Sequence, residues 1–291
     1  METHLLVRID SKMSSLSKGH KLIAEFIEQH YDQAAFLTAS RLGEIVGVSE
    51  STVVRFATEL GYTGYPQLQK AMQEMIKDKL TSVQRIEVTA AKIGDGDVLD
   101  CVLNQDIQKI RRTLEETSRE DFDRAVEAIT IADKIYIFGT RSASSLAGFL
   151  GYYLDLILGN VHIVTTASRS GMYEALLRIS DKDAIIGISF PRYSKTAASA
   201  MDFASQRGAS TIAITDSMMS PLAESAESVL IARSDMASVV DSLVAPLSLI
   251  NALIVATVIK NKDDVKETFA TLETVWYEQG VYTSTHNNHK N

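Results

Sequence analysis

The first 80 residues consist of short amphipathic stretches separated by turn-forming residues, and the clearest of these patterns covers residues 38–60. Leu42 and Val46 lie four positions apart, so they share one face of a helix. Gly47 interrupts the pattern, and glycine often ends a helix because it tolerates a left-handed backbone. Apolar residues then recur at helical spacing at Val53, Phe56 and Leu60. The spacing predicts two short helices joined by a tight turn.

The turn between these two helices has further features of a helix-turn-helix. Ser49 is suited to cap the N-terminus of the second helix, and Gly43 is small where the two helices would cross. Two short helices joined by a glycine-containing turn can place the second helix in the major groove of DNA. An ordinary pair of core helices would show the same spacing, so the pattern alone leaves that alternative open.

The side of the second helix opposite its apolar stripe carries groups that can contact DNA. Arg55 could donate two hydrogen bonds to a guanine or bind a phosphate, and Val54 could contact a thymine methyl group. The candidate DNA-binding residues are Ser49, Glu50, Ser51, Thr52, Val54, Arg55 and Thr58. Without bound DNA, the same residues would form a solvated helix face.

Other amphipathic stretches flank this pair and complete a small helical domain. Residues 5–13, 18–30 and 67–79 are predicted to be helices, with residues 31–36 as a connection, so the domain would hold five short helices within residues 1–79. Residues 80–97 are predicted to be a linker, because turn-forming and polar residues recur in them at Thr81, Ser82, Gln84, Thr89, Gly94 and Gly96.

The pattern changes after two further predicted helices at 97–116 and 119–131. Short β-branched runs now alternate with helical segments, and the runs lie at residues 134–139, 161–164, 183–189, 210–215 and 228–232. Five apolar strands separated by helices predict a parallel sheet covered on both faces. The predicted fold is therefore an all-α helix-turn-helix domain followed by an α/β domain at residues 98–280. Residues 281–291 are polar and are predicted to be a disordered tail.

Residues 17–72 resemble the N-terminal domain of the RpiR family of bacterial transcriptional regulators. The match is specific at VSESTVVRFATELGYTGYPQL, residues 48–68, which follows the family signature almost residue for residue. The resemblance implies a regulator whose C-terminal part is a sugar isomerase (SIS) domain, and residues 97–279 are similar to such a domain.

Two strand ends in the α/β domain are unusually polar. Ligands of open parallel sheets lie beyond the carboxyl ends of the strands, where helix N-termini favour anions. The first loop follows the strand at 134–139 and the second follows the strand at 183–189. The candidate effector-binding residues are Gly139, Thr140, Arg141, Ser142, Ser144, Ser189, Arg192, Tyr193, Ser194 and Thr196. Hydroxyls, amides and guanidinium groups together suit a phosphate or carboxylate, although each serine alone could be only a helix cap.

The resemblance to SIS domains implies that phosphosugars are held at these two loops, but this chain departs from the family pattern. The first loop of sugar-phosphate binders is similar to Gly-x-Gly-x-Ser, and here Arg141 replaces the second glycine and Ala143 the serine. In the second loop, Pro191 and Arg192 replace a Ser-Gly pair. Gly139, Ser189 and, more weakly, Thr196 carry over. The added arginines suggest a more acidic ligand, or one that is not a sugar phosphate.

Catalysis is not expected, because an isomerase needs a positioned base with a tuned pKa. His162 lies in the middle of a predicted strand, where a core histidine is the better interpretation. His286 and His289 have a metal-like spacing but belong to the polar tail. The sequence has no P-loop, metal-ligand cluster or nucleophile elbow, so no cofactor, metal or catalytic residue is predicted.

Charge and composition limit how the chain could bind DNA. The 291 residues carry a net charge of −8, and residues 1–80 hold 9 basic and 10 acidic residues, so 9 − 10 = −1. A nearly neutral monomeric domain gains little from counterion release. This favours a homodimer or homotetramer, in which several DNA-binding domains contact several half-sites at once.

Composition also bears on where the chain acts. One cysteine, Cys101, fits a reducing compartment. Residues 244–259 approach a membrane span but contain polar residues and Pro246, so a buried core helix fits better. A cytoplasmic protein without a membrane partner is expected.

Three hypotheses follow from the sequence. The first is a transcriptional regulator that binds a double-stranded DNA operator and changes this binding when its α/β domain takes up a small anionic metabolite. The second is an SIS-type sugar-phosphate isomerase with an accessory helical domain. The third, suggested by the neutral N-terminal charge, is an interaction module that does not bind DNA.

Overall fold

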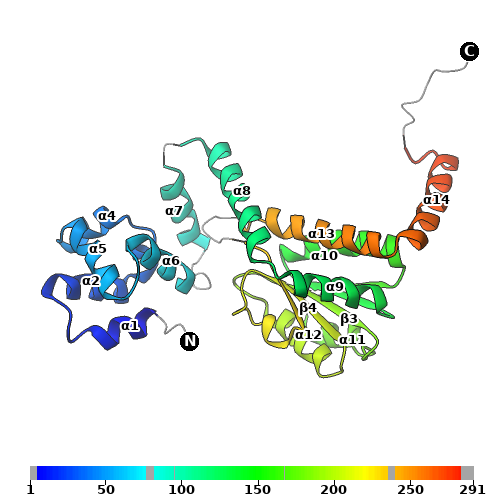
Figure 1. The fold of residues 1–291 in the computed structure, drawn as a ribbon, viewed down its shortest axis with the longest axis horizontal. Helices are drawn as coiled ribbons and strands as arrows, with labels where there is room; N and C mark the ends of the chain where they lie inside the picture. Colours follow the sequence, from blue (N-terminus) through cyan, green and yellow to red (C-terminus); the bar gives the residue numbers. More distant parts are fainter. Residues whose placement is uncertain (1–4, 77–81, 95, 167, 235–239, 283–291) are drawn as a thin grey trace, which may run out of the picture. The chain divides into compact units, whose positions relative to one another are not determined.

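The computed structural model describes residues 5–76, 82–94, 96–166, 168–234 and 240–282 (Figure 1). The chain forms two compact units: residues 1–96 together with 236–240, and residues 97–235 together with 241–291. Of the tail predicted at residues 281–291, residues 283–291 lie outside the described residues.

The first unit is entirely helical in its described part. Its helices are α1 (Leu5–Lys12), α2 (Lys18–Gln29), α3 (Tyr31–Ala34), α4 (Ala39–Val46), α5 (Glu50–Glu59), α6 (Tyr65–Ile76) and α7 (Ser82–Ile93). The predicted pair at 38–60 is confirmed as α4 and α5. Gly47 ends α4 with φ +75°, and the Ser49 hydroxyl accepts from the Thr52 amide at the start of α5.

Two segments of this unit differ from the sequence prediction. The connection predicted at 31–36 contains the one-turn helix α3. The segment predicted as a linker, 80–97, contains α7 between residues that lie outside the described part. Its glutamine, arginine, glutamate, alanine and lysine residues have good helix propensity, and this outweighs the turn-forming residues at its ends.

The core of the helical unit joins α2, α4 and α5. Leu42, Val53 and Phe56 are fully buried together with Ile23 and Ile27 of α2.

Helix α6 makes polar contacts to the turn before α4. The hydroxyl of Tyr65 donates to the carbonyl of Leu37 at 2.8 Å. The amide of Gln69 donates to the same carbonyl, and that of Gln73 to the carbonyl of Ala35. Helix α6 therefore holds the turn that leads into α4.

The second unit is a five-stranded parallel sheet with helices on both faces, which confirms the predicted fold class (Figure 1). Its strands are β1 (Ile135–Gly139), β2 (Val161–Val164), β3 (Ala184–Ile188), β4 (Ser210–Thr215) and β5 (Ser228–Ile231). Its helices are α8 (Val98–Glu116), α9 (Arg119–Ile131), α10 (Ala143–Leu158), α11 (Arg169–Ala175), α12 (Lys195–Ser205), α13 (Val244–Lys260) and α14 (Lys262–Glu278), with a 3₁₀ turn at Ala223–Ser225.

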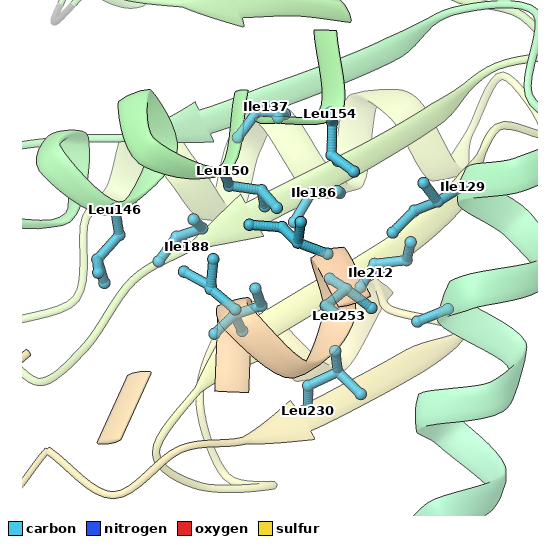
Figure 2. Packing of buried hydrophobic residues seen from close by; sticks show 14 of the residues in the cluster. Ile129, Ile137, Leu146, Leu150, Leu154, Ile186, Ile188, Ile212, Leu230 and Leu253 are labelled. Carbon is cyan, nitrogen blue, oxygen red and sulfur yellow. The ribbon is translucent and has the colours of Figure 1, made fainter. Parts of the chain in front are cut away.

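Alternation along the strands divides the core into two layers. Ile137 and Ile186 point to the face covered by α9, α10 and α13, where they meet Leu150 and Leu253 (Figure 2). The intervening residues, such as Phe138, point to the face covered by α11 and α12.

The strand order β2-β1-β3-β4-β5 places the chain reversal between β1 and β3. The chain leaves β1 toward β2 on one side and returns to β3 on the other. Helices α10 and α12, which follow β1 and β3, cover opposite faces of the sheet. The loops after these two strands therefore separate, and ligands of open α/β sheets bind at such a point.

His162 was predicted to lie in the core, and this prediction is wrong. Strand β2 is the edge of the sheet, so its pleat is covered less completely than that of the inner strands. His162 is exposed and stacks on Tyr136, with ring centroids 5.3 Å apart.

Helix α13 was the stretch most similar to a membrane span. Among the described residues, no single helix is long and apolar enough to cross a bilayer; α13 and α14 meet the length and composition criteria only together, as a pair bent by 100°. Leu249, Ile250 and Leu253 of α13 lie in the core of the second unit.

Gly43 of α4 lies close to the backbone of the turn that leads into α5. A Cβ atom at this position would lie 2.7 Å from the backbone carbonyl oxygen of Val48. Overpacking of this kind costs about 1–3 kcal/mol, so Gly43→Ala should lower the free energy of unfolding although alanine favours helices. Gly148→Ala in α10, where a Cβ meets nothing within 4 Å, is the control and should be neutral or stabilising by up to about 1 kcal/mol. Equal urea midpoints for the two variants would contradict the crossing geometry.

Tyr65 predicts a pH dependence of stability at alkaline pH. Burial raises the pKa of Tyr65 to about 12. The fold favours the neutral phenol, so this contribution is complete below the unfolded pKa of about 10 and is lost as the pH rises from 10 towards 12. The wild-type chain should lose about 2–3 kcal/mol more over this interval than Tyr65→Phe. Urea unfolding at several pH values measures the free energy of unfolding of both chains. If this free energy fell equally with pH in wild type and Tyr65→Phe, the prediction would be refuted.

Candidate effector pocket and DNA-binding helix

A cleft of about 250 Å³ lies at the carboxyl ends of β1 and β3, at the reversal of the strand order. It is lined by Thr140, Arg141, Ser142, Ala143, Ser189, Phe190, Pro191, Arg192, Ser194 and Asp241. The structure thus brings together the two polar loops that the sequence singles out. Both loops belong to the second unit.

The first loop turns tightly from β1 into α10. A Cβ on Gly139 would lie 2.6 Å from the carbonyl oxygen of Ala143, so only glycine fits at the end of the strand. Ser142 stands at the start of α10, but its hydroxyl caps no amide of that helix. It donates instead over 3.4 Å to the carboxylate of Asp241. The hydroxyl of Ser144 donates to the carbonyl of Arg141 at 2.6 Å.

The second loop is held by two serines. The hydroxyl of Ser189, which is 4% exposed, accepts a hydrogen bond from the amide of Ser194 at 3.1 Å. Ser194 in turn caps α12 by accepting from the amide of Ala197 at 3.2 Å. Arg192 stands between them and is exposed.

Arg141 and Arg192 share an uncommon backbone conformation. Their φ angles are +58° and +53°, and they are the non-glycine residues with positive φ in the described chain. This left-handed conformation costs about 1 kcal/mol or more for a residue with a Cβ. These are also the two positions where the resemblance to SIS domains expects glycine. Each loop therefore keeps the glycine conformation while adding a guanidinium group.

The charges around the cleft are mixed. Two guanidinium groups and one carboxylate, that of Asp241, belong to the lining. Guanidinium groups bind phosphate and carboxylate groups bidentately, whereas a carboxylate accepts from hydroxyl or ammonium donors. The cleft therefore suits a ligand with an anionic end and a hydrogen-bond-donating end.

The ten effector candidates divide into three groups in the structure. Thr140, Arg141, Ser142, Ser189, Arg192 and Ser194 line the cleft. Gly139 shapes it through the turn. The remaining three, Ser144, Tyr193 and Thr196, are not among its lining residues. The hydroxyl of Tyr193 donates to the carboxylate of Asp216 at 2.7 Å.

Asp241 and Phe190 are lining residues that the sequence analysis missed. Phe190 lies inside the second loop and was passed over because it is apolar. Asp241 lies 99 residues from Ser142 in sequence, and it precedes α13 in a segment without regular pattern. No local signal in the sequence indicates that it reaches this cleft.

The candidate DNA-binding residues lie as the helical spacing predicts. Six of them are exposed on α5 or at its cap, and Thr52 is half-buried; the exposed ones are Ser49, Glu50, Ser51, Val54, Arg55 and Thr58. The hydroxyl of Ser49 lies 2.9 Å from that of Ser51 and 2.8 Å from that of Thr52. The guanidinium of Arg55 donates to the carbonyl of Ser51 over 3.2 Å.

The far end of α5 is held by a contact that the sequence analysis did not predict. The imidazole Nδ1 of His20 in α2 lies 2.6 Å from a carboxylate oxygen of Glu59. The same ring meets Phe56 edge-on, with centroids 5.7 Å apart. Helix α2 thus contacts α5 on the side of Phe56 and Glu59, and the side that carries Ser51 and Arg55 stays exposed. Within the described residues, no group of three or more histidine, cysteine or acidic side chains could hold a metal ion.

Comparison with known proteins assigns both units. A family model described as the helix-turn-helix domain of the rpiR family matches residues 3–79, and the SIS domain model matches residues 128–256. The chain belongs to the RpiR family. This confirms the resemblance seen in residues 17–72 and the expected SIS domain behind it.

Relatives of this RpiR-family chain are named as transcriptional regulators. An uncharacterised HTH-type regulator of Haemophilus influenzae is 27% identical over 240 residues, which is 78% of this chain and 79% of that protein. Another, from Caldanaerobacter subterraneus, is 25% identical over 273 residues, 90% of this chain and 93% of that protein.

Solved structures also resemble this RpiR-family chain. The sugar isomerase domain of an RpiR transcription factor from Sphaerobacter thermophilus covers 61% of this chain and 98% of its own length, with 28% identity and a TM-score of 0.58. NanR of Vibrio vulnificus, solved with ManNAc-6P, covers 93% and 98% with 23% identity and a TM-score of 0.55, a likeness that shows the fold.

The two left-handed arginines predict an unusual response to glycine. Glycine relieves the left-handed strain but raises the entropy of the unfolded chain. Arg141→Gly and Arg192→Gly should therefore leave the free energy of unfolding within about 0.5 kcal/mol of wild type or raise it. The matched control is Arg111→Gly at an exposed position of α8, which should lose about 1 kcal/mol. Urea unfolding measures the free energy of unfolding of each variant. A loop variant that loses as much stability as Arg111→Gly would show that the left-handed arginines are not strained.

Proposed function

We propose that this RpiR-family chain is a DNA-binding transcriptional regulator whose SIS domain binds a phosphosugar or related acid and thereby changes operator affinity. The observation that carries the proposal is the cleft at the strand reversal, with Arg141 and Arg192 on its two loops and Asp241 across from Ser142. The arginines would hold the anionic group, and Asp241 would accept from sugar hydroxyls.

The naming of the relatives supports regulation in place of catalysis. An isomerase needs a base tuned to work near neutral pH, and the described lining offers neither histidine nor glutamate. We assign no catalytic residue. Turnover of aldose or ketose phosphates by the purified chain would favour the isomerase alternative.

DNA binding is assigned to the exposed side of α5. Arg55 would read a base in the major groove, and the hydroxyl cluster at the N-cap would meet phosphates. The near-neutral charge of residues 1–80, −1 by sequence, leads us to propose that the binding species is a homodimer or homotetramer on paired half-sites. As a regulator of transcription, the protein would act in the cytoplasm.

The DNA-binding assignment predicts a specific loss in Arg55→Ala. If Arg55 reads a base, the variant should bind the region upstream of its own gene about 1–3 kcal/mol more weakly. Its affinity for unrelated DNA should change much less. Quantitative gel shifts on both DNAs measure the ratio of the affinity for the upstream region to the affinity for unrelated DNA. Arg111→Ala in α8 is the control and should bind like wild type; an unchanged ratio in Arg55→Ala would remove Arg55 from base recognition.

The effector assignment predicts that the two arginines act on binding without supporting the fold. An Arg141→Ala, Arg192→Ala double variant should lose at least about 2–3 kcal/mol of affinity for a phosphosugar, since each charge-assisted hydrogen bond contributes about 1.5–3 kcal/mol. Isothermal titration against a panel of phosphosugars and sugar acids, including ManNAc-6P, measures this loss. If the double variant binds with wild-type affinity, the anion lies elsewhere.

A further inference from the structure

We propose that Tyr193 is a positioning residue that connects the second pocket loop to helix α8 through Asp216, Arg233 and Glu116. The proposal rests on the proposed function, because it concerns how occupancy of the same cleft reaches the rest of the chain. All of these groups lie in the second unit.

Tyr193 belongs to the second pocket loop, but its hydroxyl contacts Asp216, which is not a lining residue of the cleft. Its neighbours in sequence, Arg192 and Ser194, line the cleft, whereas Tyr193 does not. Its hydroxyl donates to the carboxylate of Asp216 at 2.7 Å. A ligand that draws Arg192 inward therefore also displaces the backbone that carries the Tyr193 ring.

Asp216 is a buried carboxylate directly after β4. It is 1% exposed, and such a group is costly to bury unless donors surround it. Its backbone carbonyl accepts from the guanidinium of Arg233 over 3.4 Å. The geometry of Asp216 is therefore tied to Tyr193 on one side and to Arg233 on the other.

Arg233 connects this group to the end of α8. Its guanidinium forms an ion pair with Glu116, and its backbone amide donates to the hydroxyl of Thr113 at 2.8 Å. Thr117, which follows α8, donates to the carbonyl of Ile231 at the end of β5, also at 2.8 Å. Three contacts thus fasten the last turn of α8 to the segment that leaves the sheet.

The opposite wall of the cleft reaches the same helix. Asp241 lines the cleft, and the hydroxyl of the next residue, Ser242, donates to Asp106 of α8 at 2.7 Å. Asp106 also pairs with Lys109 at 3.0 Å, and Lys109 is 5% exposed. Both walls of the cleft are therefore connected to α8 through polar groups, one near the middle of the helix and one at its end.

Helix α8 is the first element of the second unit, and the chain enters it directly from Gly96 of the first unit. A change in the cleft that alters the hold on α8 changes how the chain leaves the DNA-binding unit. Coupling of two sites requires an element whose state both sites affect. In the proposal α8 is this element, because contacts from both walls of the cleft reach it.

Hydrogen–deuterium exchange on the intact chain tests the connection without a ligand. Tyr193→Phe removes only the hydroxyl and should raise amide exchange in residues 113–117 by at least about fivefold, as expected for weakened local structure. Glu116→Gln should raise exchange in the same peptide, and the double variant should exceed the stronger single variant by less than twofold, because the groups act in series. Tyr152→Phe at an exposed tyrosine of α10 is the control and should leave this peptide unchanged. A Tyr193→Phe effect confined to residues 189–197 would overturn the proposal.

A second measurement separates this connection from the proposed function. With ManNAc-6P as the probe, Tyr193→Phe should retain its dissociation constant within about twofold, while the ratio of operator affinities with and without the probe falls to about 1. A wild-type ratio retained in Tyr193→Phe overturns the connection. If the wild-type chain does not bind this probe, the probe fails as effector, and the exchange experiment still decides the role of Tyr193.

Discussion

The position of β1 between β2 and β3 is the constraint on which the effector unit depends. Because the chain continues to opposite sides of β1, the loops after β1 and β3 cannot pack against each other and a cleft remains between them. Close packing keeps this geometry fixed, since Gly139 has no room for a Cβ and Ile137 and Ile186 fill one face of the strands. The cleft is thus a consequence of strand order, and the loop side chains decide what it binds.

The two loops carry arginine side chains on a backbone conformation that favours glycine. Arg141 and Arg192 keep a left-handed conformation that glycine would adopt without strain. Arginine in place of glycine at both loops puts two cations in the lining of one cleft, and the carboxylate of Asp241 offsets only one of them. The proposed role of the two guanidinium groups in anion binding gives a reason for the strain at these positions, because both side chains are exposed and neither contributes to the core.

The sequence predicted the parts of the fold whose signals are local. Gly47 and Ser49 mark the ends of α4 and α5, and the alternation of apolar strands with helices determines a parallel sheet. It could not predict the role of Asp241, which reaches the cleft from a distant segment, nor the direction in which Tyr193 points. His162 was misplaced because an apolar strand pattern does not reveal whether the strand is at the edge of the sheet. Residues 82–93 formed a helix because helix propensity outweighed flanking turn residues.

The central claim is that occupancy of the cleft and occupancy of the operator are linked in one chain. It is tested most directly by titrating labelled operator DNA with the intact protein, with and without saturating phosphosugar identified by calorimetry. A linked regulator shows at least about a fivefold change in operator dissociation constant, corresponding to about 1 kcal/mol of coupling. Tight phosphosugar binding with an unchanged operator dissociation constant would contradict it.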